Sequence, residues 1–249
     1  MHKYIRFIFL CLFVVLSGCS SIYIPSVPNT PMLTTEGEIA AGAHISLKGN
    51  VNFNSAYALS NHFAVLANGA YQKNKTEKKE VKHKMIELGG GYFKTFGPDK
   101  NRILEIYAGI GKGKSDKLFH QFDNNDVLTS TDFDQAKYDK KFIQVNYSSK
   151  KKDNVRLFGV NFGLNFGTAL RMSFVKTSDF YRNDVLQANE DNIFIEPVFF
   201  TRMILSEQVQ LQYTSGSNFG LKSRKFLNAG NSIFSIGAVV NLGRAPKKQ

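Results

Sequence analysis

The feature that most constrains this chain is an alternation of apolar and polar side chains with a period of two, from residue 36 onward. In one run, Val209, Leu211 and Tyr213 alternate with glutamines. In another, over residues 158–166, phenylalanine, valine and leucine alternate with glycine and asparagine. Such alternation indicates β-strands whose two faces meet different surroundings. Because no segment keeps a helical period for more than two turns, we predict an all-β fold.

Turn-forming residues divide this region into about eleven strand segments. We predict strands near 37–47, 51–59, 62–73, 84–96, 102–113, 140–148, 155–166, 168–178, 192–204, 208–215 and 231–243. The connections at 48–50, 60–61, 97–99 and 206–207 are short, whereas those at 74–83, 114–139, 179–191 and 216–230 are long and polar. Rough alternation of short and long connections is typical of transmembrane β-barrels, which in bacteria have an even number of strands. Since 140–178 is ambiguous, we predict a single antiparallel up-and-down barrel of about ten strands, with eight and twelve open.

Composition agrees with strands and argues against a bundle of membrane helices. The chain has 249 residues, with 22 Phe, 20 Gly and only 6 Pro, which suits long strands joined by tight turns. Its mean hydropathy of −0.22 is too low for a protein with many membrane helices.

The N-terminus carries an export signal. Lys3 and Arg6 precede an apolar run over residues 7–16 that is too short to span a bilayer as a helix. The next residues, Leu16-Ser17-Gly18-Cys19, resemble the lipobox of bacterial lipoproteins. The resemblance implies that residues 1–18 are removed as a signal peptide and that Cys19 is acylated. Two or three acyl chains anchor a protein stably, and Ser20 after the cysteine implies sorting to the outer membrane.

The rest of the chain divides into three parts. Residues 19–35 contain Pro25, Pro28 and Pro31, and we predict that they form an extended, lipidated tether. Residues 36–243 form the predicted barrel, and residues 244–249 form a basic C-terminal tail. Since Cys11 would be lost with the signal peptide, the mature chain could form no internal disulfide.

Several short motifs of the barrel region resemble those of the small outer-membrane β-barrel proteins of Gram-negative bacteria. They are Gly37-Glu38-Ile39, Ala56-Tyr57-Ala58-Leu59 with Asn61-His62-Phe63, Glu105-Ile106-Tyr107-Ala108-Gly109, and the closing run Gly237-Ala238-Val239-Val240-Asn241-Leu242-Gly243. The resemblance implies a fold rather than a function, because members of that group have varied roles.

Five charged residues fall in the middle of predicted strands: Glu87, Glu105, Arg171, Glu196 and Arg202. A charge facing lipid at mid-depth costs about 2–4 kcal/mol for a basic side chain. We therefore predict that all five face the barrel interior and form a charge network there. Paired carboxylates for acid–base chemistry and a polar pore are the two functional alternatives.

The charge balance suggests anionic partners. The full chain has a net charge of +12, and removal of Lys3 and Arg6 with the signal peptide leaves 30 basic and 20 acidic residues. Basic segments around residues 73–84, 150–152 and 222–225 could contact lipopolysaccharide phosphates, although an ordinary solvated surface is the alternative. We expect membrane lipid to be bound through acylated Cys19, and we expect a monomer with no nucleic-acid partner, metal or cofactor.

Three functions remain open at this point. The first is a non-enzymatic outer-membrane β-barrel lipoprotein with a structural, adhesive or transport-related role. The second is a lipid-tethered periplasmic β-barrel that binds a small apolar ligand. The third, an outer-membrane lipid hydrolase, needs a catalytic triad, and only His44, Ser46 and Glu38 share a strand face.

Overall fold

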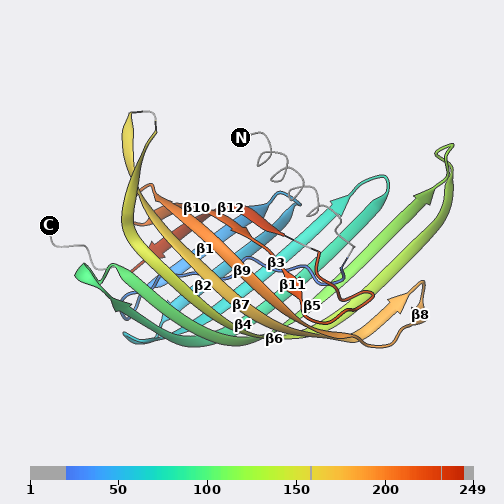
Figure 1. The fold of residues 1–249 in the computed structure, drawn as a ribbon, viewed down its shortest axis with the longest axis horizontal. Coiled ribbons are helices and arrows are strands. Elements are labelled where there is room, and N and C mark those ends of the chain that lie inside the picture. Colours follow the sequence, from blue (N-terminus) through green and yellow to red (C-terminus); the bar gives the residue numbers. More distant parts are fainter. Residues whose placement is uncertain (1–20, 158, 231, 244–249) are drawn as a thin grey trace, which may run out of the picture.

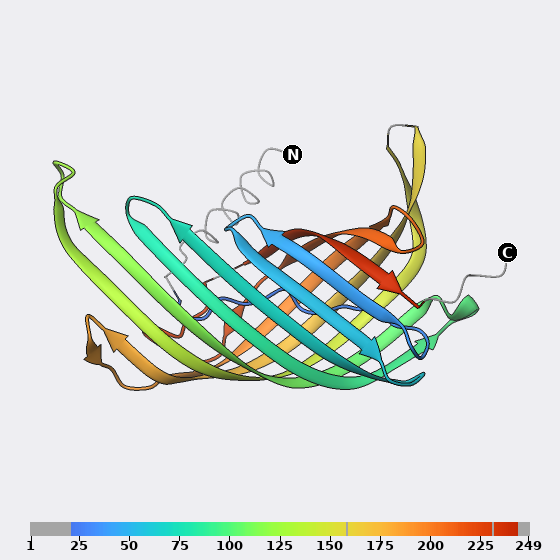
Figure 2. The ribbon, with the colours of Figure 1, turned by 180° about the vertical axis from the view of Figure 1, so that it is seen from behind.

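The computed structural model describes residues 21–157, 159–230 and 232–243 and shows an all-β protein. The predicted signal peptide (residues 1–18), Cys19 and the predicted tail at 244–249 lie outside the described residues. Ten strands form one closed antiparallel barrel, which confirms the predicted fold class and the predicted strand number. Figures 1 and 2 show the barrel from opposite sides.

The strands of the barrel wall differ greatly in length. They are β1 (Ile39–Ser46), β2 (Asn50–Ala58), β3 (Phe63–Lys75), β4 (Lys79–Phe96), β5 (Arg102–Phe122), β6 (Leu128–Leu157), β7 (Val160–Arg182), β9 (Asp191–Ile204), β10 (Val209–Gly216) and β12 (Ile233–Leu242). Two short strands, β8 (Val185–Leu186) and β11 (Phe219–Gly220), extend hairpins beside β7 and β9, and a short 3-10 helix, η1, covers Pro98–Lys100. The long hairpins β5–β6 and β6–β7 project at opposite ends (Figure 1).

Every strand of the wall has two hydrogen-bonded neighbours. β1 pairs with β2 and with β12, where Ala41 lies opposite Val240, and β7 pairs with β9, where Arg171 lies opposite Glu196. The ring therefore has no open edge, which is how a β-structure can satisfy its backbone hydrogen bonds within lipid.

The two ends of the barrel carry different connections. We call the end where β1 begins and β12 ends the terminal rim; it carries the turns 59–62, 97–101, 158–159 and 205–208. We call the opposite end the loop rim; it carries 47–49, 76–78, 123–127, 183–190 and 217–232. The two longest connections, 183–190 and 217–232, both lie at the loop rim.

The outer surface of the wall carries a belt of exposed apolar side chains. On β4, for example, Ile86 and Leu88 are more than half exposed, while the alternate residues Met85 and Glu87 are buried. The belt continues around the barrel through Ile106, Ile143, Leu170, Phe199, Leu211, Ile236, Ile45 and Phe53. Exposed aromatic residues edge it near the terminal rim at Tyr57, Phe63, Tyr92 and Tyr147. An apolar outer belt with an aromatic edge is the pattern of a lipid-facing barrel.

The ambiguous region 140–178 differs from the sequence prediction. The predicted strands 155–166 and 168–178 are not separate crossings, which is one of the possibilities that made this region ambiguous: β6 ends at Leu157, and β7 runs from Val160 to Arg182 without interruption. The expected long loop at 114–139 is wrong: β5 and β6 pair up to Phe122 and Leu128, leaving a turn of five residues at 123–127. Both strands extend well beyond the apolar belt, and their outer parts are as polar as a loop. Because strands were predicted from apolar alternation, these outer parts were not recognised as strand.

Candidate functional site: the N-terminal segment inside the barrel

The lumen of the barrel is occupied by the chain's own N-terminal segment, Ser21–Thr34, which we call the luminal segment. Its residues 21–33 are all buried and form no regular secondary structure. Figure 1 shows it as the blue trace that crosses the interior between the two rims. We predicted that this stretch forms part of an extended tether, and the structure places its residues 21–34 within the barrel.

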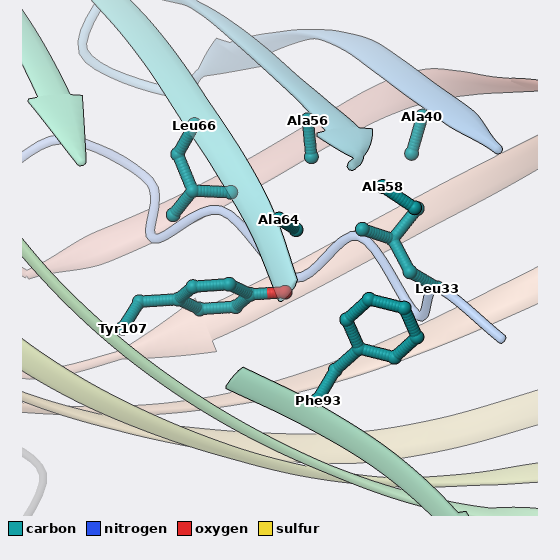
Figure 3. Packing of buried hydrophobic residues seen from close by; sticks show 8 residues of the cluster. All are labelled: Leu33, Ala40, Ala56, Ala58, Ala64, Leu66, Phe93 and Tyr107. Carbon is teal, nitrogen blue, oxygen red and sulfur yellow. The ribbon is translucent and has the colours of Figure 1, made fainter. Parts of the chain in front are cut away.

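Apolar side chains of the luminal segment fit into separate apolar patches of the inner wall. Leu33 packs among alanines of β1–β3 together with Phe93 and Tyr107, as Figure 3 shows. Four further clusters each contain a different member of the segment: Ile22, Tyr23, Val27 and Met32. Each apolar patch of the inner wall is therefore built around one side chain of the segment. Burying one such side chain stabilises the folded state by about 1.5–3 kcal/mol.

Polar side chains of the wall bind the backbone of the segment. Asn52 accepts a hydrogen bond from the Val27 amide at 3.2 Å, and Asn54 donates to the Val27 carbonyl at 3.3 Å. The Asn29 carbonyl accepts hydrogen bonds from Gln144 at 2.6 Å and from Asn146 at 3.1 Å. The backbone of an irregular segment has no neighbouring strand to hydrogen-bond with. Side-chain amides of the wall supply these hydrogen bonds instead.

Tyr23 connects the segment to the charged groups of the lumen. Its hydroxyl donates to Glu196 Oε1 at 2.6 Å and accepts a hydrogen bond from Lys140 Nζ at 2.7 Å. One buried hydroxyl of the segment thus joins an acidic and a basic side chain of the wall.

Glu87 and Arg171, two of the five predicted interior charges, are fully buried and lie together. Lys140 Nζ is 2.7 Å from Glu87 Oε1, and Arg171 Nη1 is 3.5 Å from Glu87 Oε2. Arg171 also donates to Ser26 of the luminal segment at 3.1 Å. This buried triad is thus completed by hydrogen bonds to the segment, as buried charges require.

The remaining three predicted charges are also buried and bind the luminal segment. Glu105 Oε1 accepts the backbone amides of Met32 at 3.0 Å and Leu33 at 3.3 Å. Arg202 donates to the Thr30 carbonyl, and its Nε donates to Gln212 at 2.6 Å. Glu196 binds Tyr23 as described. The lumen thus brings all five predicted residues inside, but groups them around the segment rather than in one cluster.

Sequence reasoning missed Lys140 and the luminal segment itself. Lys140 stands in the run Lys137-Tyr138-Asp139-Lys140-Lys141, which looks like solvent-exposed sequence, but it shares strand parity with Gln144 and Asn146. Alternate residues of β6 face inward, so counting back by twos from Gln144 would have identified Lys140 as an inward-facing residue. The signal for the segment is that residues 20–34 contain no charged side chain, although 21% of the chain is charged.

The direction of the luminal segment is fixed by its two ends. At the loop rim, the Ser21 carbonyl accepts a hydrogen bond from Lys117, and the Ile22 amide donates to the Phe226 carbonyl at 3.0 Å. At the terminal rim, the Thr34 amide donates to Glu38 Oε2 at 2.8 Å, just before β1 begins. The chain therefore enters at the loop rim, crosses the lumen and turns back into the wall at the terminal rim.

Part of the connection 217–232 covers the loop-rim end of the segment. Leu227 is fully buried against the cluster of Tyr23, and Phe226 packs with Ile22 and Phe180. The amides of Phe226 and Leu227 donate to Glu190 Oε2 at 3.1 and 2.7 Å. The connection is thus held down on the opening through which the segment enters.

The residues considered for a hydrolase do not form a catalytic triad. Glu38 and Ser46 lie at opposite ends of β1, roughly 26 Å apart at the usual rise per residue. The Ser46 hydroxyl accepts the Asn50 amide at 3.0 Å, and Glu38 is bound to Thr34 and Thr35. The geometry therefore does not support nucleophilic catalysis by this set.

A small cavity lies inside the barrel beside the segment. A cavity lined by Asn29, Thr30, His44, Asn54 and Arg202 has a volume of about 10 Å³, roughly the room that one water needs. Within the described residues, no three His, Cys, Asp or Glu side chains gather as a metal site would require. The arrangement suits mechanical closure of the lumen better than binding of a ligand within it.

Comparisons with known proteins give distant similarities only. No protein-family model matches the chain, and no curated protein matches its sequence. Among solved structures, the translocator domain of the autotransporter NalP from Neisseria meningitidis is similar at 11% identity and a TM-score of 0.45, covering 82% of this chain and 85% of that one. The β domain of the Bordetella autotransporter BrkA is similar at 10% identity and a TM-score of 0.30, covering 84% and 99%. The low TM-scores give these likenesses no bearing on function.

In the part of the chain that the structure describes, no helix has the length and apolar character needed to cross a membrane.

Proposed function

We propose that this chain is a non-enzymatic outer-membrane β-barrel lipoprotein whose lumen is closed by its own N-terminal segment, and that it has a structural or adhesive role. The observation that carries the proposal is the opposite polarity of the two faces of one closed sheet. The outer face is an apolar belt, and the inner face carries buried charges such as Glu87 and Arg171 bound to the luminal segment.

The alternative, a periplasmic barrel that binds an apolar ligand, needs the reverse polarity. A soluble barrel turns its apolar side chains inward and leaves room among them. Here the inner apolar patches are filled by Leu33, Val27 and other residues of the luminal segment. Exposed side chains such as Ile86, Ile110 and Phe199 would face water, and an apolar belt of this size in water would favour aggregation.

Membrane integration can be tested by extraction with carbonate or urea and by gel mobility. With Cys19→Ala and an exchanged signal peptide, an integral barrel stays in the membrane fraction and shifts in mobility on boiling. Release of this variant into the soluble fraction would favour the periplasmic alternative. The same variant tests acylation, because labelled palmitate should enter the natural chain and not Cys19→Ala.

Closure of the lumen makes a separate, electrical prediction. The purified protein in a planar bilayer should show no steady conductance, because the luminal segment crosses the whole interior. A variant lacking residues 21–34 should conduct if it folds. As a second variant, Val27→Asp with Leu33→Asp keeps the chain length but disfavours packing against the wall, and it should produce intermittent opening. Steady conductance by the natural chain would contradict the proposed closure.

The direction of the luminal segment also bears on the lipid anchor. Two residues span at most about 7 Å, and Ser21 lies at the loop rim. Acyl chains on Cys19 would therefore enter the leaflet at the loop rim, and not the one at the terminal rim. Outer-membrane barrels usually turn their longer connections to the cell exterior. On this orientation the proposed anchor lies in the outer leaflet.

A further inference from the structure

Outward-facing lysines form a band along the loop-rim side of the apolar belt, confined to β3–β7. We call them the lysine band: Lys73, Lys82, Lys84, Lys112, Lys114, Lys137, Lys141 and Lys176. All point away from the lumen, and all but the half-buried Lys114 are exposed. These lysines lie on the strands themselves, whereas the sequence analysis had considered basic segments in the loops.

The register brings several of these like charges directly opposite one another. Lys73 pairs with Lys82 across β3 and β4. Lys84 pairs with Lys114, and Lys114 in turn pairs with Lys137. Opposed residues of antiparallel strands have their Cα atoms about 5 Å apart, and like charges in such pairs are destabilising. An anion that binds between them would remove this repulsion.

The protein itself supplies only part of the compensating charge. Asp139, Asp116 and Asp179 lie 3.8, 3.4 and 3.0 Å from Lys112, Lys114 and Lys137 respectively. The other five members have no carboxylate within 4.0 Å among the described residues: Lys73, Lys82, Lys84, Lys141 and Lys176. In the register, Lys82 lies opposite Asp116, and Lys176 lies opposite Asp139 and Asp191. Eight lysines against Asp116, Asp139, Asp179 and Asp191 leave the band with an excess of positive charge.

The depth of the band matches the phosphates of a lipid leaflet. Lys84, Lys141 and Lys176 each lie two residues beyond an apolar side chain of the belt, on β4, β6 and β7 respectively. Two residues of a strand tilted by about 40° advance about 5 Å along the membrane normal. The headgroup region begins where the hydrocarbon core ends and is about 5–7 Å thick. These ammonium groups would therefore lie among headgroups, next to the lipid-facing apolar belt.

On β4 and β5, four lysines of the band lie on the loop-rim side of the belt, whereas Lys94 and Arg102 lie on its terminal-rim side. Further basic residues, at positions 150–152 and at Arg156, lie in the part of β6 that continues past its ladder with β5. We propose that the lysine band binds the phosphate groups of lipopolysaccharide in the leaflet at the loop rim. This inference rests on the proposed function, since it requires an integral barrel.

Binding can be tested with two matched double variants. Lys84→Gln with Lys141→Gln removes two members of the band, and Lys94→Gln with Arg102→Gln removes the same charge from the opposite boundary. Detergent-solubilised protein would be titrated with bis-phosphorylated lipid A, with its dephosphorylated form, with phosphatidylglycerol and with inorganic phosphate. The band variant should bind bis-phosphorylated lipid A about tenfold more weakly, and the control variant should bind like the natural chain.

Each outcome of this experiment decides the inference. Equal weakening in both variants, or equal binding of phosphorylated and dephosphorylated lipid A by the natural chain, would overturn it. Tighter binding of phosphatidylglycerol than of lipid A would overturn the choice of lipopolysaccharide. If the band variant fails to fold, the phosphorylated and dephosphorylated lipids compared on the natural chain still decide. A carbonate-resistant, heat-modifiable barrel that does not bind lipid A would refute this inference and leave the proposed function intact.

Discussion

Lys140 on β6 donates a hydrogen bond of 2.7 Å to the hydroxyl of Tyr23, and the same ammonium group lies 2.7 Å from Glu87. One buried cation therefore serves both the wall and the luminal segment. Taking a charge out of water is costly unless it is paired and hydrogen-bonded. Because Tyr23 supplies one of these bonds, the electrostatics of the wall are satisfied only while the segment is in place.

The first prediction concerns this cation. Lys140→Met should lower the free energy of unfolding by about 3–5 kcal/mol, because it leaves Glu87 buried with less compensation. Lys141→Met is the matched control: it is the next residue, but it faces outward. Its effect should stay within about 0.5 kcal/mol. Urea unfolding in micelles measures both. Equal effects of the two substitutions would show that the buried pair does not stabilise the fold.

The second prediction concerns the hydroxyl of Tyr23. Tyr23→Phe should lower the free energy of unfolding by about 1–3 kcal/mol at neutral pH, since Lys140 and Glu196 each lose a hydrogen-bond partner. Urea unfolding in micelles measures the difference. Unchanged stability of Tyr23→Phe would show that these two hydrogen bonds do not hold the segment in the lumen.

Much of the fold follows from the sequence, because the alternation reports what each face meets. In the middle of the strands, one face meets lipid and the other meets a polar lumen, so apolar and polar residues alternate with a period of two. Most strand centres can be located from this alternation. Beyond the belt the outer faces of β5 and β6 carry polar side chains, and towards the tips of the hairpin both faces are exposed, so the apolar alternation fades there. Strand pairing continues because the backbone ladder does not require apolar side chains, and this is why 114–139 looked like a loop.

The candidate site was only half predictable for a related reason. Charges such as Glu105 and Arg202 stand out against apolar neighbours on a strand, so their parity identifies them as inward-facing. The luminal segment has no period, because its backbone is bound by side chains such as Asn52 and Gln144 that lie far away in the sequence. Its partners become neighbours only when the barrel closes.

The third prediction tests whether the segment occupies the lumen in the membrane. Ser26→Cys places a thiol on the segment at a site that is 1% exposed, and Ser178→Cys places one on the exposed face of β7. With Cys19→Ala and the exchanged signal peptide described above, each variant carries a single cysteine after removal of that peptide. A membrane-impermeant maleimide should label Ser178→Cys readily and Ser26→Cys only after denaturation. Equal labelling of both in the native state would show that the segment leaves the lumen.

The fourth prediction concerns the side of the membrane at which the N-terminus emerges. Ser21 contacts Lys117 and Ile22 contacts Phe226, both at the loop rim, whereas the turn at 205–208 lies at the terminal rim. An epitope inserted between residues 20 and 21 should therefore be recognised by antibody on intact cells. The same epitope inserted between Ser206 and Glu207 should be recognised only after the outer membrane is permeabilised. The reverse pattern would mean that the loop rim faces the periplasm, and recognition of both insertions on the same side would contradict the course of the segment through the barrel.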